Sequence, residues 1–321
     1  MISIENINKF YGDYKALDDV SLYIPEKCIY GLLGPNGAGK TSLIRILNQI
    51  TAPDSGRILF NDQPLERRHV EMIGYLPEER GLYKKMKVGE QVMYFAQLKG
   101  LDKHEAKRRL KFWFEKFDIG GWWNRKVEDL SKGMQQKVQF IVTVIHEPKL
   151  LILDEPFSGF DPINAEMIKN EILQLRKDGA TIIFSTHNMK SVEEMCDKIA
   201  LINRSKKILE GRVETIKNKH KTNNYEIRFE GNMISFSTAL WAGYKLLHHE
   251  GDKDNMRAVV SCADNQSIND LLAVLIPAVK IKSVSEIIPS MNEIFIQISP
   301  KICRIIGIDG CQKSFIKHFS F

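Results

Sequence analysis

Long apolar runs are missing from this chain of 321 residues. No window approaches the roughly 18 apolar residues that a membrane-spanning helix requires. The first segment, residues 1–11, carries Glu5 and Lys9 where a signal peptide would have an apolar centre. We therefore expect a chain that cannot cross a bilayer alone.

Cysteine is scarce, and the sequence has no internal repeat or low-complexity tract. The cysteines number five and include no Cys-x-x-Cys pair: Cys28, Cys196, Cys262, Cys303 and Cys311. An odd number without paired spacing does not suggest a disulfide framework. A reducing, cytosolic setting fits this usage best.

A large excess of charge of one sign is also missing, because the formal net charge is +6. Basic residues gather in one stretch, 204–221. We interpret this stretch as a solvated helix and linker in preference to a nucleic-acid surface, and we expect no nucleic-acid partner. The chain is longer than a usual single core, so we expect two structural units.

What the sequence does contain is a glycine-rich turn directly behind an apolar run, residues 28–33. The turn, 34–41, reads Gly-Pro-Asn-Gly-Ala-Gly-Lys-Thr, and the pattern predicts a helix from Lys40 to about Asn48. A strand, such a turn and a helix N-terminus together point backbone N–H groups at one spot, where anionic phosphate binds. The candidate nucleotide-binding residues of this segment are Gly34, Pro35, Asn36, Gly37, Ala38, Gly39, Lys40, Thr41 and Ser42.

Two side chains of this phosphate loop have expected roles of their own. Lys40 is expected to reach the β- and γ-phosphates of a nucleotide. The Thr41 hydroxyl is placed to hold Mg²⁺. The alternative interpretation is an ordinary glycine turn, which the strand before it and the helix after it disfavour.

A second pattern supplies carboxylates. The apolar run 150–153 predicts a buried strand, and Asp154 and Glu155 follow it directly. At such a strand end the first carboxylate can organise a Mg²⁺ shell and the second can polarise an attacking water. Asp154 is therefore a candidate metal residue and Glu155 a candidate general base, although two acids there could merely cap the next loop.

A third pattern lies between these two. Ser131 precedes a helical pattern that runs to about Ile145, and Gly133 allows close approach to the start of that helix. We expect Ser131 to be the N-cap of the helix and its N-terminus to suit phosphate. The motif is weak alone, and it gains weight from its place between the phosphate loop and Asp154.

The first part of the chain alternates as strands do. Segments 2–7 and 21–24, with a turn at Gly12–Asp13, predict a small antiparallel sheet. Arg57–Phe60 and Ile73–Leu76 are further strand candidates.

The period then becomes helical from Val88 to about Ile145. Within that region Leu110, Trp113, Phe114 and Phe117 would line one helix face, which we interpret as core.

Two nearly continuous apolar runs, 150–153 and 181–184, enclose a helical segment, 163–177. Such runs alternating with helices indicate a parallel sheet covered on both faces. A second, smaller α/β unit is predicted from a strand at 225–229, a helix at 267–275 and a strand at 293–298. The remainder, 299–321, has no assigned role and is expected to be a disordered or weakly docked tail.

Taken in order, these motifs resemble those of the ATP-binding subunits of ABC transporters, over roughly residues 1–298. Leu130–Met134 corresponds to the family signature. Ser158–Asp161 resembles the D-loop, and Ser185–His187 resembles the segment that carries the switch histidine. Tyr11 resembles the aromatic platform for adenine.

The resemblance implies an α/β fold of the P-loop NTPase class, ABC type. Its parts would be a core mixed sheet with helices, an antiparallel β-subdomain and a helical subdomain at about 84–145. The ATP-binding domain would span 1–218, and a small C-terminal α/β domain would span 225–298. Two subunits, as a homodimer or heterodimer, would stack head to tail, so that each ATP lies between Lys40 of one subunit and Ser131 of the other.

Departures from the family pattern occur at three positions. The signature has Lys132 and Met134 where the family usually has Gly and Gln, and Glu78 stands where most members have a Mg²⁺-contacting glutamine. These variants resemble the branch that serves ABC-2-type exporters, including the sodium-efflux ATPase group, whose members also end in a small domain. We interpret them as marks of lineage and keep Glu78 as a candidate metal residue.

The function implied is an ATPase that uses ATP and Mg²⁺ to power a separately encoded membrane permease, bound at the cytoplasmic face of the membrane. Glu155 and His187 are the candidate catalytic residues, His187 sensing or stabilising the γ-phosphate unless it is a histidine satisfied within the core. The alternatives are a soluble ABC ATPase acting on nucleic acid or ribosomes, and a regulatory nucleotide-binding module without transport. A single cassette without sustained heptads disfavours the first, and the presence of Glu155 disfavours the second.

Overall fold

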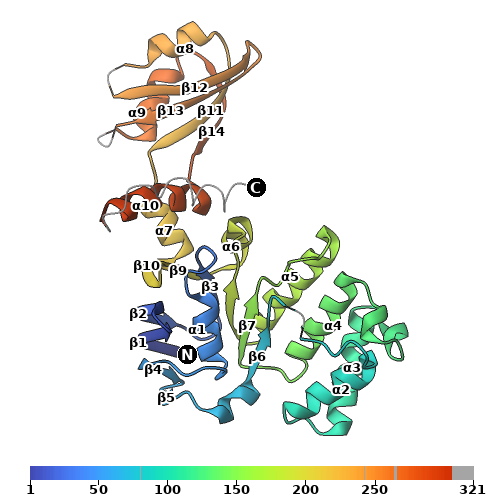
Figure 1. Cartoon of the computed structure of the whole chain (residues 1–321). Coiled ribbons are helices and arrows are strands. Elements are labelled where there is room, and N and C mark those ends of the chain that lie inside the picture. Colours follow the sequence, from blue (N-terminus) through green and yellow to red (C-terminus); the bar gives the residue numbers. More distant parts are fainter. Residues whose placement is uncertain (80, 242, 264–265, 306–321) are drawn as a thin grey trace. The chain divides into compact units, whose positions relative to one another are not determined.

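The computed structural model describes residues 1–79, 81–241, 243–263 and 266–305, of which 299–305 are described by their backbone only. The chain divides between Val213 and Glu214 into two compact units (Figure 1). This division falls somewhat before residue 218, where the resemblance ends the ATP-binding domain. In the part of the chain that is described, no helix has the length and apolar character needed to span a membrane.

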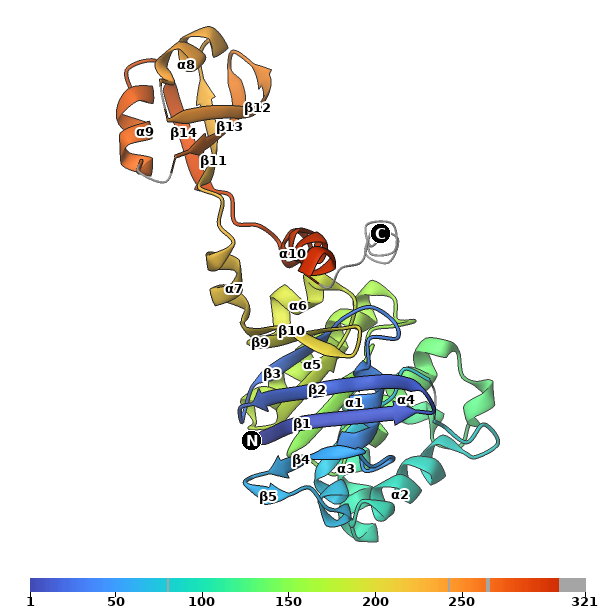
Figure 2. The ribbon, with the colours of Figure 1, turned by 60° about the vertical axis from the view of Figure 1, so that its left-hand side comes forward.

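Unit 1 begins with an antiparallel sheet in the strand order β2-β1-β4-β5 (Figure 2). Its strands are β1 (Ile2–Tyr11), β2 (Tyr14–Ile24), β4 (Ser55–Phe60) and β5 (Gln63–Pro64). In β1, Ile2, Ile4 and Ile7 are buried. The opening alternation and the turn at Gly12–Asp13 are thereby confirmed.

The core sheet of unit 1 has the order β10-β9-β3-β8-β7-β6. It contains β3 (Ile29–Leu33), β6 (Ile73–Leu76), β7 (Leu150–Asp154), β8 (Thr181–Ser185), β9 (Lys198–Asn203) and β10 (Lys206–Arg212). All neighbours pair in parallel except β10, which runs antiparallel to β9. Every residue of β3, β7 and β8 is buried, which confirms the covered parallel sheet.

Helices pack on this sheet, and one of them also packs on the antiparallel sheet. They are α1 (Lys40–Leu47), α5 (Pro162–Lys177) and α6 (Met189–Met195). In Figure 1 the core strands β6 and β7 stand between α1 and α5. Leu43 and Ile46 of α1 belong to one buried cluster with Ile4 of β1 and Tyr30 of β3, so α1 is fixed between the two sheets.

The rest of unit 1 is helical. It comprises α2 (Val88–Leu98), α3 (Lys103–Lys116) and α4 (Lys132–Val144), with 3-10 turns η1 (Arg67–Met72), η2 (Gly120–Trp122) and η3 (Val127–Asp129). The aromatic stripe of α3 is core as predicted, because Trp113 stacks on Phe117 at 5.5 Å and meets Phe140 of α4 at 6.2 Å. These contacts hold α3 against α4.

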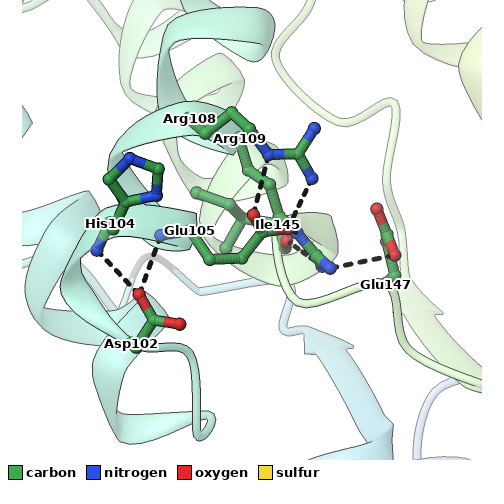
Figure 3. A network of polar contacts seen from close by, with 7 residues as sticks. All are labelled: Asp102, His104, Glu105, Arg108, Arg109, Ile145 and Glu147. Atoms are coloured by element: carbon green, nitrogen blue, oxygen red, sulfur yellow. Dashed lines mark hydrogen bonds and ion pairs between the residues drawn. The ribbon is translucent and has the colours of Figure 1, made fainter.

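A network of polar contacts also joins α3 to the residues that follow α4 (Figure 3). Asp102 caps α3 by accepting from the backbone N–H groups of His104 and Glu105. Arg109 then donates to Glu105 at 2.5 Å and to the Ile145 carbonyl at 3.1 Å, and it lies 3.2 Å from Glu147. Arg109 therefore ties α3 to the segment that leads from α4 into β7.

Unit 2 is smaller, and between α7 (Val213–Lys219) and α10 (Met291–Ile305) it has the element order β-α-β-β-α-β. Its elements are β11 (Asn224–Glu230), α8 (Met233–Ala239), β12 (Tyr244–Asp252), β13 (Asn255–Cys262), α9 (Ile268–Leu275) and β14 (Lys280–Glu286). The sheet order is β12-β13-β11-β14, all antiparallel, which is the ferredoxin-like arrangement. Phe236 of α8 and Leu271 of α9 share a buried cluster with Phe229 of β11.

The predicted strand at 293–298 is wrong. Those residues lie in α10 (Met291–Ile305). The Ser290 hydroxyl accepts from the backbone N–H of Glu293, and the Glu293 carboxylate accepts from the backbone N–H of Ser290. This reciprocal capping box starts a helix, and Met291, Ile294 and Phe295 follow at helical spacing and are buried.

Two further expectations need correction. The basic stretch 204–221 is not only helix and linker, because its first half forms the edge strand β10, and only α7 (Val213–Lys219) is helical. The expected tail begins inside α10, whose backbone continues through residues 299–305, and positions 306–321 lie outside the described residues. The described cysteines Cys28, Cys196 and Cys262 are buried free thiols.

Candidate functional site

The phosphate loop connects β3 to α1, and tertiary contact dictates glycine at two of its positions. Gly34 has φ +147° and Gly39 has φ +112°, both in the region that favours glycine. A Cβ at Gly34 would lie 2.0 Å from the Ile202 carbonyl oxygen, and one at Gly39 would lie 2.3 Å from that of Ala16. The loop is thus pressed against β9 and β2, and a side chain at either position would displace it.

Lys40 is folded back over this loop. Its Nζ donates to the Gly34 carbonyl at 2.6 Å and to the Pro35 carbonyl at 3.1 Å. Burial lowers the pKa of Lys40, while the negative charges of Asp154, Glu155 and Glu78 raise it. The structure therefore brings Lys40 and the three predicted carboxylates into one electrostatic environment.

Asp154 ends β7 and is buried. Burial raises the pKa of Asp154, and the neighbouring charges of Glu155 and Glu78 raise it further, against the opposing effects of Ser185 and Lys40. Carboxylates thus outnumber cations here, and oxygen ligands with excess negative charge fit a hard cation such as Mg²⁺. Among the described residues no three His, Cys, Asp or Glu side chains form a cluster that could hold a metal ion by themselves.

The two candidate catalytic residues, Glu155 and His187, are in direct contact. Glu155 Oε1 lies 2.7 Å from His187 Nδ1 and accepts from the His187 backbone N–H at 2.9 Å. The Thr186 hydroxyl donates to Glu155 Oε2 at 3.0 Å. Glu155 also has φ +48°, a conformation that a non-glycine residue rarely adopts. The turn after β7 is therefore strained in a way that aims Glu155 at the end of β8.

Ser131 is the N-cap of α4, as predicted. Its hydroxyl accepts from the Met134 backbone N–H at 3.3 Å, and both Ser131 and Lys132 are exposed. Figure 1 draws α1 and α4 on opposite sides of β6 and β7. The hydroxyl of Ser131 bonds within its own helix, and Gly133 lies in the same first turn, whereas residues 34–42 belong to the phosphate loop and the first turn of α1.

The segment that resembles the D-loop, Ser158–Asp161, runs beside the start of α4. A Cβ at Gly159 would lie 3.2 Å from Gln136 Nε2, and Asp161 caps α5 by accepting from the backbone N–H groups of Ile163 and Asn164. The cap at Asp161, followed by Pro162, is a signal that the sequence offered and that our prediction of this loop did not use.

Exposed aromatic rings stand at the end of the β1–β2 hairpin. Tyr11 is 44% exposed, with Lys9 Nζ 5.6 Å from its ring centre. Tyr14, opposite Tyr11 in the strand pair, donates its hydroxyl hydrogen to the Gly37 carbonyl at 2.8 Å. Sequence reasoning missed Tyr14, although its place across a two-residue turn from Tyr11 could have drawn attention to it.

Two family models match different parts of this chain. The family model described as "ABC transporter" matches residues 17–158, and the model "ATP-binding protein DrrA1-3-like, C-terminal domain" matches residues 211–299. The uncharacterized ABC transporter ATP-binding protein YhaQ of Bacillus subtilis is 45% identical over 233 residues, covering 73% of this chain and 78% of YhaQ.

Two further relatives extend the likeness. The lantibiotic transport ATP-binding protein SrtF of Streptococcus pyogenes is 34% identical over 230 residues, 72% of this chain and 99% of SrtF. A solved structure titled "Structure of ATP binding subunit of ABC transporter" superposes with a TM-score of 0.64 at 27% identity, covering 68% of this chain and 92% of that one.

Proposed function

Because the chain belongs to the ATP-binding subunits of ABC transporters and is an ATPase coupled to transport, we propose that it powers an ABC-2-type exporter from the cytoplasmic face of the membrane. The permease would be a separate protein. Three features support this proposal: the relative SrtF is named for lantibiotic transport, the C-terminal part matches the DrrA1-3-like model, and Glu78, Lys132 and Met134 resemble the exporter branch.

ATP would bind with its phosphates on the loop from Gly34 to Ser42 and its adenine on Tyr11. Lys40 would leave the Gly34 and Pro35 carbonyls for the β- and γ-phosphates, since a charged oxygen is the better acceptor for an ammonium group. Mg²⁺ would be held by Thr41, Asp154 and Glu78, and it would neutralise charge that develops on the phosphates. The excess of carboxylates around Lys40 supports this assignment.

The observation that carries the proposed ATP hydrolysis is the position of Glu155. It follows Asp154 directly, lies in the environment of Lys40, and contacts His187 at 2.7 Å. A carboxylate in this position can accept a proton from an attacking water. His187, whose side chain is 68% exposed, can hold Glu155 in place and reach toward the γ-phosphate.

Two copies of the ATP-binding subunit would be needed for each complete site. Ser131 and the N-terminus of α4 are exposed and would meet ATP bound to Lys40 of the partner. Ser131 and Gly133 are therefore proposed as nucleotide-binding residues that act across the dimer.

The permease would contact unit 1 near an exposed aromatic cluster, Tyr83, Tyr94 and Phe95. Tyr83 is 55% exposed and stacks on Phe95 at 5.9 Å, and Tyr94 is 41% exposed. An apolar aromatic surface of this kind is suited to a protein partner. Tyr83 lies in the segment between β6 and α2 that also carries Glu78, so this segment would link permease contact to metal occupancy.

Mixing inactive subunits tests the shared site. Lys40→Ala and Ser131→Arg proteins are each expected to lack ATPase activity. In a mixed dimer one site carries both lesions and the other carries neither, so partial recovery supports the proposal. No recovery, despite proven mixed dimers, would mean that each site lies within one chain.

Co-purification in detergent from the native membrane separates the remaining alternatives. The proposed exporter subunit is expected to bring down a permease together with ATPase activity. A soluble ABC ATPase would bring down no permease, and a regulatory module would bring down a permease without ATPase activity.

A further inference from the structure

The β1–β2 hairpin makes a specific hydrogen bond to the phosphate loop. Tyr14 is the first residue of β2, and its hydroxyl donates to the Gly37 carbonyl at 2.8 Å. The Tyr14 residue is nevertheless 55% exposed. Its contact with the loop therefore depends on the hydroxyl group far more than on burial of the ring.

This bond fixes one peptide unit of the loop at both ends. The Gly37 carbonyl accepts from Tyr14, and the N–H of the same peptide unit, that of Ala38, donates to the Pro35 carbonyl at 3.2 Å. A peptide held at its oxygen and its nitrogen cannot rotate freely. The N–H groups on either side of it keep one orientation, which is what anion binding by a loop requires.

The hairpin end is itself anchored beside the loop, so it can serve as a support. The Ser205 hydroxyl donates to the Lys15 carbonyl at 2.5 Å, and the Ser205 backbone N–H donates to the Ala38 carbonyl at 3.1 Å. One turn residue of unit 1 thus joins the residue after Tyr14 to the residue after Gly37. Tyr14 approaches the loop from a backbone already held in place.

We propose that Tyr14 is a positioning residue for ATP binding: its hydroxyl holds the Gly37 carbonyl so that the phosphate loop is oriented before nucleotide arrives. The inference deepens the proposed function and rests on it, because it concerns the same site. Tyr14 also lies opposite Tyr11 in the hairpin. The proposed adenine platform and the phosphate loop are therefore supported by the same short segment.

Tyr14→Phe tests the hydroxyl alone, because the ring remains. A hydrogen bond of this kind changes binding about 2- to 10-fold. We expect the Kd and KM for ATP to rise by that factor while kcat stays unchanged, because the Tyr14 hydroxyl bonds to the phosphate loop, which is proposed to bind ATP, and Glu155 and His187 are the proposed catalytic residues.

Hydrogen exchange on the full-length, nucleotide-free protein gives a second readout. Amides of residues 36–39 are expected to exchange several-fold faster in Tyr14→Phe than in the wild type. Tyr23→Phe is the matched control: Tyr23 lies in the same strand, is 47% exposed, and directs its hydroxyl to Met1 Sδ at 3.2 Å. It should change neither exchange in the loop nor ATP affinity.

Unchanged loop exchange in Tyr14→Phe would overturn the inference, and so would an unchanged Kd for ATP. A lower kcat at constant KM would also overturn it, because Tyr14 would then act in the chemical step. If the wild type bound no ATP, the proposed function itself would fail, whereas the exchange comparison would still show whether Tyr14 orders the loop.

Discussion

Carboxylates meet very different surroundings in the two units. In unit 1, Asp154 is buried, and burial raises its pKa, while Lys40 beside it has its pKa lowered by burial. In unit 2, the Glu226 side chain is 16% exposed, and hydrogen bonds from the more exposed Arg257 and Arg228 lower its pKa. The surroundings of Asp154 disfavour the ionised carboxylate, whereas those of Glu226 favour it.

This difference distinguishes the candidate nucleotide site of unit 1 from the charged surface of unit 2. Arg257 reaches Glu226 at 2.5 Å and Glu250 at 2.7 Å, so that the charges of this face are paired within unit 2 itself. Ion pairs whose arginine partners are as exposed as Arg257 and Arg228 contribute little to stability. Around Lys40 the charges are not balanced by the protein, and perturbed groups of this type cluster where a ligand completes the balance.

The largest effect that the comparison predicts is on turnover. Glu155→Gln is expected to lower ATP turnover by about 10²- to 10⁴-fold, because an amide cannot accept a proton from water as a carboxylate does. ATP binding should persist, and the variant should accumulate as an ATP-bound dimer. Single-turnover hydrolysis measures this.

Glu226→Gln in unit 2 is the matched control for that substitution, since it makes the same change of side chain on the paired surface. It should hydrolyse ATP at the wild-type rate. A wild-type rate in Glu155→Gln itself would remove Glu155 from the role of general base.

A smaller effect is expected at Glu78, whose charge acts on both Lys40 and Asp154. Glu78→Gln should keep ATPase activity within about tenfold, because Asp154 and Thr41 remain. The Mg²⁺ concentration for half-maximal rate should rise about fivefold, equivalent to roughly 1 kcal/mol, since hard cations prefer charged oxygen. A Mg²⁺ titration that matches the wild type would show that Glu78 points away from the metal.

Asp154→Asn should stabilise the nucleotide-free fold while damaging activity. The folded protein retains the Asp154 proton to higher pH than the unfolded chain, whose value is near the ordinary 3.8. The free energy of unfolding of the wild type therefore falls as the pH rises from 3.8 to the raised pKa of Asp154. Above that pKa the ionised Asp154 destabilises the fold by its full amount. We expect the variant to melt about 1–3 °C higher at neutral pH.

Thermal melting without nucleotide or Mg²⁺, compared across pH, measures this difference. It should shrink as the pH falls toward 3.8. A variant that melts lower than the wild type at neutral pH would show that the ionised Asp154 is stabilised in the fold.

The smallest effect belongs to the charged face of unit 2. Glu226→Gln should shift the melting temperature by less than roughly 2 °C, because Arg257 and Arg228 are exposed enough for water to solvate them when the ion pairs are lost. A larger fall in melting temperature, measured by calorimetry, would mean that the network around Arg257 stabilises the sheet. The contrast drawn between the charged groups of the two units would then be wrong.

Local periodicity explains what could be predicted of the fold. The apolar runs of β7 and β8 and the stripe of α3 each bury a face that their own spacing defines. The strand predicted at 293–298 was wrong because a short apolar alternation fits a strand as well as a helix. The capping pair Ser290 and Glu293, which lies just before and within it, was the deciding signal.

Within the site, the residue types were predictable and their partners were not. The loop 34–41 identifies itself by glycine spacing and its flanking elements. Tyr14 carries no such pattern, and its role depends on a hydrogen bond to Gly37 across the fold. The strained φ of Glu155 is likewise invisible in the sequence, because the turn conformation is imposed by the strands on either side.

The sequence by itself determined the chemistry available to this protein: a phosphate loop, two carboxylates behind a buried strand, and a serine at a helix start. The tertiary structure decided which of these groups meet. Asp154 ends β7, while Glu78 and His187 follow β6 and β8. These residues lie near the phosphate loop after β3 because parallel pairing in the order β3-β8-β7-β6 brings the strand ends to one edge of the sheet. That order is fixed by long-range strand pairing and burial, which no local spacing encodes.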